Sequence, residues 1–340
     1  MSWINRLAAR APVPVFIAQG KSAPDALARL SLNPAIHVVD SPRAACILLV
    51  AGRIPSALAD CLNRLHDQLP HPRATVLWQS HAMEPFSDAV EVDASGDIAS
   101  ALSATFADLL AGYRPSEVDI LPDAPPNEWR GIGPHGQGGK GMMGGTPYGR
   151  PMAKTDDDIR DGLALDAYTA DFGPFLPVIP PGLALTLTLQ GDMIQAVTVA
   201  HPPFEGDTAA RERMLRLLGL PALALRSQQG QKDNGTFRRL VRLSGARAAI
   251  PADLGRLRDG SDVRSRFDTM VAGIQTAPAS DTDMTLGDLL VGLEWQEALL
   301  VINSLDNATL QGVCARRNAS PDSKNDHAHG EHDMHAGHMG

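Results

Sequence analysis

The sequence predicts an α/β protein in which a doubly wound parallel sheet is followed by a Gly-rich linker and a smaller α+β domain with a β-hairpin and helices. Three observations predict this: short apolar runs alternating with helical patterns, a long stretch rich in Pro and Gly, and an alternating hairpin pattern beyond it. A length of 340 residues favours two domains, and 44% hydrophobic residues suffice to fill their cores. We expect domains at 1–114 and 162–318, a Pro/Gly-rich loop at 115–161 and a disordered tail at 319–340.

The first predicted domain alternates between short apolar runs typical of strands and apolar residues at helical spacing. Short apolar runs with β-branched residues are typical of strands buried on both faces, and the predicted strands are Val13–Ala18, Ile36–Val39, Cys46–Val50, Thr75–Trp78 and Ala89–Val92. Helical spacing of apolar residues predicts helices over Ser56–Leu69 and Ile98–Leu110, the second one stopped by Gly112. Such alternation predicts parallel strands with right-handed crossovers.

The segment 115–161 has no apolar periodicity and carries nine glycines from Gly131 to Gly149. So long an irregular segment is either a flexible linker or a functional loop laid over a partner. The large side chains in this segment favour the second interpretation, a loop that contacts a partner, because flexible linkers rarely carry them. The residues that we assign to partner contact are His135, Lys140, Met142, Met143, Tyr148 and Arg150.

The second domain opens with the predicted hairpin. Its strands are Leu183–Leu189 and Met193–Val199, joined by a turn at Gly191-Asp192. Helical patterns follow over Thr208–Leu218, Val263–Ile274 and Leu286–Leu305.

Composition limits the classes of function. A net charge of −9 argues against nonspecific nucleic-acid binding, which needs a positive surface. Three cysteines without CxxC spacing fit a reducing compartment and no disulfide framework. No window reaches the length of a membrane span, and Pro12 and Pro14 interrupt the N-terminal apolar run, which argues against a secretory signal. We therefore expect a cytoplasmic protein attached to the inner face of a membrane through partners.

Three motifs of the first domain occur in a specific order. Pro42-Arg43 precedes a predicted strand, Val50-Ala51-Gly52 ends it, and Asp-Gln-Leu-Pro-His-Pro-Arg (67–73) precedes the next strand. This region resembles the small, cluster-bearing subunit of respiratory complex I and membrane-bound [NiFe] hydrogenases, and the resemblance implies a flavodoxin-like fold.

The cluster ligands of that family are not matched. The loops that carry cysteines in the family read Gly20-Lys21-Ser22, Ser80-His81-Ala82 and Ala94–Asp97 here. Without thiolates at these places, we expect no iron–sulfur cluster. Cys46 and Cys61 are interpreted as core residues, one in a strand and one in a helix. Gly20-Lys21-Ser22 does not predict a phosphate loop either, because Val15 stands where that motif needs glycine.

The hairpin and its Gly-Pro-rich entry, 173–202, resemble the N-terminal part of the large, quinone-site subunit of the same assemblies. The hydrogenase members hold nickel through two CxxC motifs, and the chain has neither. The turn that bears histidine in quinone-reducing members matches Phe172–Pro177, which contains none. The resemblance thus implies the scaffold of both subunits without their chemistry.

We therefore expect a noncatalytic scaffold or coupling subunit of a complex I-like or hydrogenase-like assembly, without catalytic or cofactor-binding residues of its own. Its expected partners are membrane subunits of a complex I-like or antiporter-like assembly and other soluble subunits. One alternative is the redox subunit of an NADH-quinone oxidoreductase-type enzyme whose partners supply the cofactors. Another is a protein that handles nickel, copper or zinc.

The metal alternative rests on the C-terminal tail. Five histidines within twelve residues can bring two or three imidazoles to one Ni²⁺, Cu²⁺ or Zn²⁺ ion, and they are His327, His329, His332, His335 and His338. A solubilising tail with incidental metal affinity is the competing interpretation. Two further acidic patterns, Glu294 with Glu297 and the run Asp156–Asp158, are interpreted as a solvated helix face and a hydrated loop.

Overall fold

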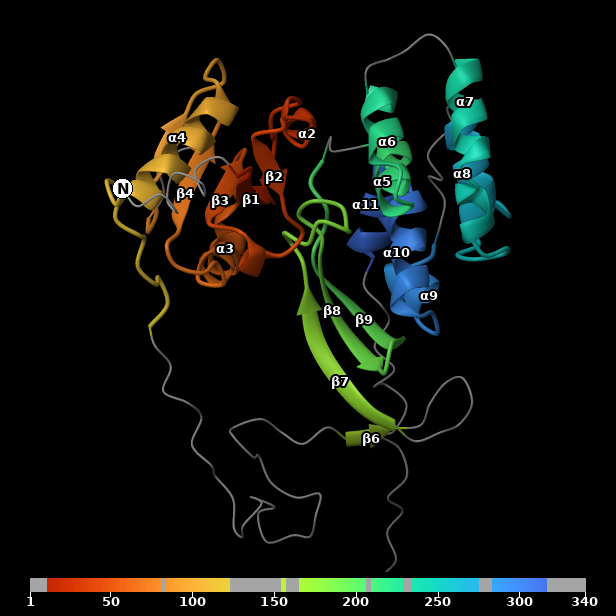
Figure 1. The fold of residues 1–340 in the computed structure, drawn as a ribbon. Coiled ribbons are helices and arrows are strands. Elements are labelled where there is room, and N and C mark those ends of the chain that lie inside the picture. Colours follow the sequence, from red (N-terminus) through yellow and green to blue (C-terminus); the bar gives the residue numbers. More distant parts are fainter. Residues whose placement is uncertain are drawn as a thin grey trace, which may run out of the picture.

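The structure is a computed structural model that describes residues 11–80, 84–122, 154–156, 165–205, 209–228, 234–274 and 283–316. It is mixed α/β, with a five-stranded parallel sheet and a separate four-stranded antiparallel sheet that carries helices (Figure 1). The predicted combination of a parallel sheet and a smaller α+β part is therefore confirmed at this level.

The first sheet has the strand order β2-β1-β3-β4-β5, and every neighbouring pair is parallel. Its strands are β1 (Val13–Gln19), β2 (Ile36–Val38), β3 (Ile47–Ala51), β4 (Ala74–Trp78) and β5 (Val90–Val92). All five predicted strands are present, with ends shifted by a residue or so. One correction concerns Cys46, which lies just before β3 rather than inside a strand.

Helices cover both faces of this sheet. Alternate residues of β3 point to opposite faces, so Leu48 and Val50 share one core with Leu62 of α3 (Ala59–His66). Leu49 belongs to the other core, with α2 (Leu27–Leu30) and α4 (Ile98–Ala111). The predicted helix Ser56–Leu69 is shorter than expected, because a 3₁₀ turn, η2 (Ser56–Leu58), precedes α3.

The second sheet is an antiparallel meander of β6 (Lys154–Asp156), β7 (Leu165–Phe172), β8 (Ala184–Gln190) and β9 (Met193–His201). The predicted hairpin is confirmed as β8 and β9, with Gly191 at a φ of 61° in the turn. β7 was not predicted from the sequence, because Asp166 and Asp171 interrupt its alternation of apolar and polar residues.

Helices pack on one face of the second sheet and share a single core with it (Figure 1). They are α5 (Ala210–Leu217), α6 (Pro221–Gln228), α7 (Asn234–Leu243), α8 (Val263–Ala272), α9 (Leu286–Leu290), α10 (Trp295–Ser304) and α11 (Asn307–Ala315). The 3₁₀ turn η4 (Ala246–Ala249) follows α7. In the described part of the chain, every helix is too short or too polar to cross a bilayer.

The prediction of one helix over Leu286–Leu305 is wrong. The chain breaks after α9, where Gly292 adopts a φ of 86° and donates its amide to the carbonyl of Ile194 at 2.9 Å. The Ile194 amide donates in return to the carbonyl of Leu293 at 2.9 Å. The break thus gives the helical layer a direct main-chain connection to β9.

Candidate functional site: the junction between the two sheets

The loops that follow β1 and β3 are bonded to each other. The Lys21 amide donates to the Arg53 carbonyl at 2.8 Å, and the Arg53 amide donates to the Lys21 carbonyl at 2.9 Å. In doubly wound sheets the crevice for ligands opens at this carboxyl edge, where the strand order reverses. In the order β2-β1-β3, that place lies between β1 and β3. Here the two loops pair across it.

Two glycines permit this pairing. A Cβ on Gly20 would lie 2.7 Å from the Arg53 carbonyl oxygen, and one on Gly52 would lie 2.6 Å from the Lys21 carbonyl oxygen. Gly52 also adopts a φ of 81°, which side-chain-bearing residues rarely adopt. The Gly20-Lys21-Ser22 triplet therefore serves loop pairing.

The Gly-Pro-rich entry to the hairpin contributes to the cores of both sheets. Phe175, from this entry, and Phe204, which follows β9, are buried in the core on the α3 face of the first sheet. Ile179 and Leu183, from the same entry, are buried in the core of the second sheet. One short segment therefore joins the two parts of the molecule through apolar packing.

Phe204 is held in place by several contacts. Its amide donates to the Pro181 carbonyl at 2.9 Å, and its ring lies against Gly182, where a Cβ would come within 2.6 Å of the ring. The His201 ring contacts the Phe204 ring edge-on, with centroids 5.7 Å apart, and its Nδ1 is 2.8 Å from the Gly182 carbonyl. On the side of the first sheet, the Lys21 ammonium lies 5.9 Å from the ring centroid. Phe204 is thus the centre of the junction.

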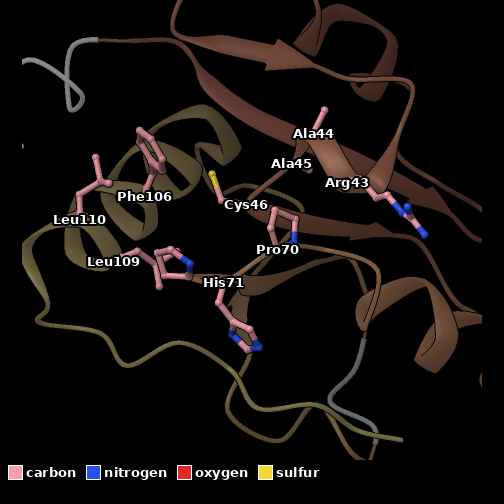
Figure 2. Close-up of a pocket in the computed structure, with 10 residues that line it drawn as sticks. Arg43, Ala44, Ala45, Cys46, Pro70, His71, Phe106, Leu109 and Leu110 are labelled. Carbon is pink, nitrogen blue, oxygen red and sulfur yellow. The ribbon is translucent and has the colours of Figure 1, made fainter. Parts of the chain in front are cut away.

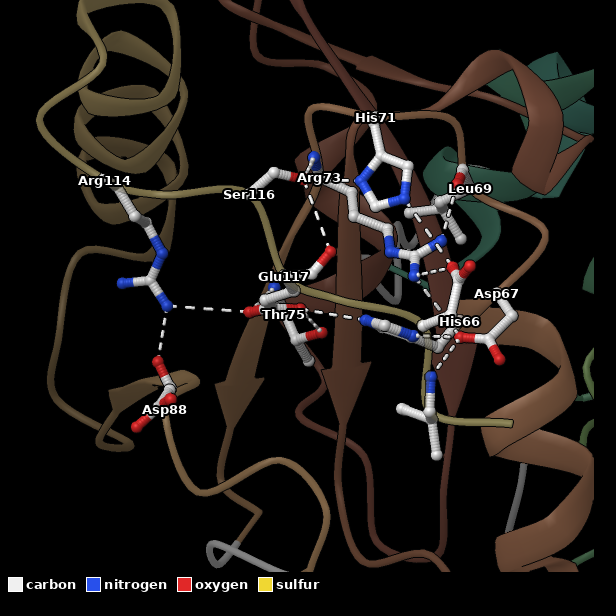
Figure 3. A network of polar contacts seen from close by, with 12 residues as sticks. His66, Asp67, Leu69, His71, Arg73, Thr75, Asp88, Arg114, Ser116 and Glu117 are labelled. Carbon is white, nitrogen blue, oxygen red and sulfur yellow. Dashed lines mark hydrogen bonds and ion pairs between the residues drawn. The ribbon is translucent and has the colours of Figure 1, made fainter. Parts of the chain in front are cut away.

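A network of charged groups occupies the other end of α3 (Figure 3). His66 is 2% exposed, and its two ring nitrogens face carboxylates: Nδ1 lies 2.8 Å from Asp67 and Nε2 lies 3.1 Å from Glu117. Glu117 also accepts from the amide and the hydroxyl of Thr75, both at 2.7 Å. These contacts fix the chain after α4 to strand β4.

Arg73 supplies the positive charge of the same network. Its side chain is 1% exposed, and the guanidinium donates to the Leu69 carbonyl at 3.0 Å and pairs with Asp67 and Asp119. Asp67 accepts in addition from the amides of Ile120 and Leu121, at 3.0 and 2.8 Å. Both ends of the Asp-Gln-Leu-Pro-His-Pro-Arg motif therefore bind the segment 116–121, the beginning of the stretch predicted as a Pro/Gly-rich loop.

Two acidic members of the network, Asp67 and Glu117, have pKa values that favour their charged forms. Burial alone would raise the pKa of Asp67, but the amides of Ile120 and Leu121 and the His66 ring lower it below its ordinary value. Burial likewise opposes ionisation of Glu117, yet hydrogen bonds from His66 and Thr75 keep its pKa below the ordinary value. This network is a structural clamp that includes two ionised carboxylates.

A small cavity of about 240 Å³ lies at the opposite edge of the first sheet, beside the amino ends of β3 and β4 (Figure 2). Its lining is mostly apolar and includes Cys46, His71 and Phe106. Burial raises the pKa of Cys46 to about 11, so its thiol is protonated at neutral pH. Burial also raises the pKa of Cys61 and takes that of Cys314 to about 12. All three cysteines are therefore poor thiolate donors.

The residues around the carboxyl edge do not fit an iron–sulfur cluster. Gly20-Lys21-Ser22, Ser80 and Ala94–Asp97 offer no thiolate, and Cys46 lies at the other edge of the sheet. In the described ranges, no three His, Cys, Asp or Glu side chains are grouped so that they could hold a metal ion.

All six partner-loop residues and all five tail histidines lie outside the described residues. Asp156 ends β6. The prediction that Glu294 and Glu297 form a solvated face within a helix is wrong. Glu294 caps α10, and its amide donates to the Glu297 carboxylate at 3.2 Å.

Sequence reasoning missed the residues that build the junction and the clamp. Phe175 and Phe204 stand in Pro-rich surroundings without periodicity, and Glu117 follows the last predicted helix of its domain. A signal was available for the aromatics, because only eight phenylalanines occur in 340 residues and two of them flank the hairpin. Neither a protein-family model nor a curated protein matches the chain.

Proposed function

We propose that this chain is a noncatalytic scaffold or coupling subunit of a membrane-associated complex I-like or hydrogenase-like oxidoreductase assembly. The observation that carries the proposal is the junction, where the hairpin entry places Phe175 in the core of the first sheet and Ile179 in that of the second. The two segments that resemble separate subunits are thus packed together within one chain.

A flavodoxin-like fold of the first part is also proposed. The strand order β2-β1-β3-β4-β5 is the flavodoxin order. The helices divide as that fold requires, with α2 and α4 on one face and α3 on the other. These features support the resemblance to the small subunit, although they carry no information on chemistry.

A structural role is supported by what the motifs that carry the resemblance do in this chain. Loops that could open a ligand crevice pair with each other at Lys21 and Arg53. The charged ends of the motif, Asp67 and Arg73, bind the segment 116–121. The chain then proceeds from this fixed point toward the residues that we assign to partner contact, so the clamp gives that loop a defined origin.

The proposal also places the protein in the cytoplasm, attached to the membrane through partner subunits. Purification under native conditions from mildly solubilised membranes, with an affinity tag other than histidine, tests it. We expect the chain to co-migrate in one large complex with antiporter-type membrane proteins and soluble redox subunits. Recovery of the chain alone from both membrane and soluble fractions would contradict the proposal.

The experiment needs a control that separates specific assembly from contamination. The double variant Phe175→Ser and Phe204→Ser removes the apolar contact between the two parts and is expected to lose the complex. A variant of the exposed residue Tyr113, Tyr113→Ser, leaves the junction untouched and is expected to keep it.

A further inference from the structure

Helix α7 differs in charge from the rest of the chain. Its sequence, NGTFRRLVRL, contains three arginines and no acidic residue. The described residues of 209–274 carry twelve arginines against five carboxylates, whereas the whole chain has a net charge of −9. Positive charge is therefore concentrated in one part of an acidic protein.

One face of α7 is fixed and the other is free to meet a partner. Phe237 and Val241, four residues apart, are buried in the core of the second sheet. Arg238, Arg239 and Arg242 are exposed, and so are Leu240 at 37% and Leu243 at 72%. Figure 1 shows α7 with α8 at the far side of the helical layer from the first sheet. The exposed face thus combines arginines with two leucines.

Among the described residues, these arginines differ from others nearby in having no carboxylate partner. Arg247 pairs with Asp268 at 2.7 Å, Arg258 pairs with Asp283 at 3.4 Å, and Arg256 pairs with Asp253. Within the described part of the chain, no carboxylate lies at ion-pair distance from Arg238, Arg239 or Arg242. Their charges are available to an external anion.

We infer that the exposed face of α7 binds the anionic headgroups of a lipid bilayer directly. Guanidinium groups form paired hydrogen bonds with phosphate oxygens, and their aliphatic stems can lie beside Leu240 and Leu243 at the depth of the headgroups. An anionic leaflet attracts such a cluster electrostatically, and the exposed leucines add apolar burial.

The shape of the surface favours lipid over an acidic protein segment. The face is a single convex helix of ten residues, and its two exposed leucines, Leu240 and Leu243, are neighbours three residues apart. A specific protein interface needs roughly 800 Å² of complementary surface on each partner. A bilayer adapts to a convex helix without such complementarity. This inference concerns the purified chain and lipid alone, so it stands or falls independently of the proposed function.

Flotation of the full chain with vesicles tests the inference. We expect binding to vesicles of phosphatidylglycerol and phosphatidylcholine, and none to pure phosphatidylcholine. Each arginine contributes roughly fivefold to partitioning, so R238Q/R239Q/R242Q is expected to weaken binding by about a hundredfold. Added salt is expected to weaken it as well.

A matched control is available in the same part of the chain. The variant R247Q/R256Q/R258Q removes the same number of charges from exposed arginines that are already paired, and it is expected to keep vesicle binding. Circular dichroism checks that both triple variants are folded. L240S/L243S is expected to weaken binding by about tenfold.

Three results would overturn direct lipid binding by α7. Absence of flotation with anionic vesicles, or an equal loss in both triple variants, would overturn the inference. Binding to polyglutamate that depends on Arg238, Arg239 and Arg242, without binding to vesicles, would also overturn it and would identify α7 as a contact for an acidic protein.

Discussion

The ammonium of Lys21, in the loop after β1, lies 5.9 Å from the centre of the Phe204 ring, which follows β9. More than 180 residues separate the two in sequence. A cation at this distance from an aromatic face adds only about 0.5–1 kcal/mol when exposed. Burial of the ring, which is 3% exposed, contributes more. The contact marks the place where the parallel sheet and the hairpin part meet, and it makes Phe204 a sensitive point for experiment.

The fit of the Phe204 ring against Gly182 leads to a first prediction. Gly182 adopts a φ of 83°, and a Cβ there would lie 2.6 Å from the ring. Gly182→Ala should lower the unfolding free energy by about 1–2 kcal/mol through its backbone. Displacement of the ring should add about 1–3 kcal/mol.

Gly191→Ala is the matched control for that experiment. Gly191 also has a positive φ, 61°, but no atom lies within 4 Å of the added Cβ. This variant should therefore show only the backbone cost in urea denaturation. Equal losses in both variants would mean that the ring does not pack against Gly182.

The charge clamp gives a second prediction. Asp67→Ala should lower the unfolding free energy by about 3 kcal/mol, because Arg73 is 1% exposed and loses a partner. Hydrogen exchange should report the change locally, since the amides of Ile120 and Leu121 both donate to Asp67. Faster exchange at 116–121 is expected, and Asp108→Ala, on an exposed part of α4, should leave that exchange unchanged. Unaltered exchange in Asp67→Ala would mean that the segment is held by other contacts.

The lowered pKa values of Asp67 and Glu117 give a third prediction, on pH. A carboxyl group whose pKa is lower in the folded state stabilises the fold fully when the pH is above its ordinary pKa. This stabilisation is lost as the pH falls through the pKa of the group in the folded state. The ordinary value is 4.5 for Glu117 and 3.8 for Asp67. The difference in unfolding free energy between wild type and Glu117→Gln should be largest above pH 4.5 and should shrink as the solution is acidified below it. A difference that stays constant down to the acid-unfolded state would contradict the assignment.

The tail gives a fourth prediction. Calorimetric titration of the full chain with nickel should show binding that disappears when the chain is truncated before His327, because two or three imidazoles can bind one ion. Since the imidazoles must be neutral to bind, affinity should fall as the pH is lowered through the range in which histidine is protonated. Unchanged nickel affinity after truncation would dismiss the tail as a metal site.

The elements with strong periodicity were predictable from sequence. The five parallel strands and the hairpin follow from short β-branched runs and from the turn at Gly191-Asp192. The break after Leu290 was not predictable, because its cause lies in pairing with Ile194, far away in the chain. Apolar residues at 286–305 satisfy helical spacing whether or not the helix is interrupted.

Less of the candidate site was predictable. The motif from Asp67 to Arg73 was recognisable as a pattern, but its role depends on Glu117, Ile120 and Leu121, which approach it only in the folded chain. Phe204 gave no periodic signal, since it belongs to neither a strand nor a helix. Pairing between Lys21 and Arg53 follows from the order of strands, which apolar patterns alone do not determine.

We propose that this chain keeps a two-part scaffold without an iron–sulfur cluster of its own. Iron and acid-labile sulfide analysis of the full chain, purified anaerobically, tests it most directly. We expect no stoichiometric iron or sulfide, because the loops at the carboxyl edge of the first sheet offer no thiolate and instead pair at Lys21 and Arg53. About four iron atoms and four sulfides per chain would contradict the account.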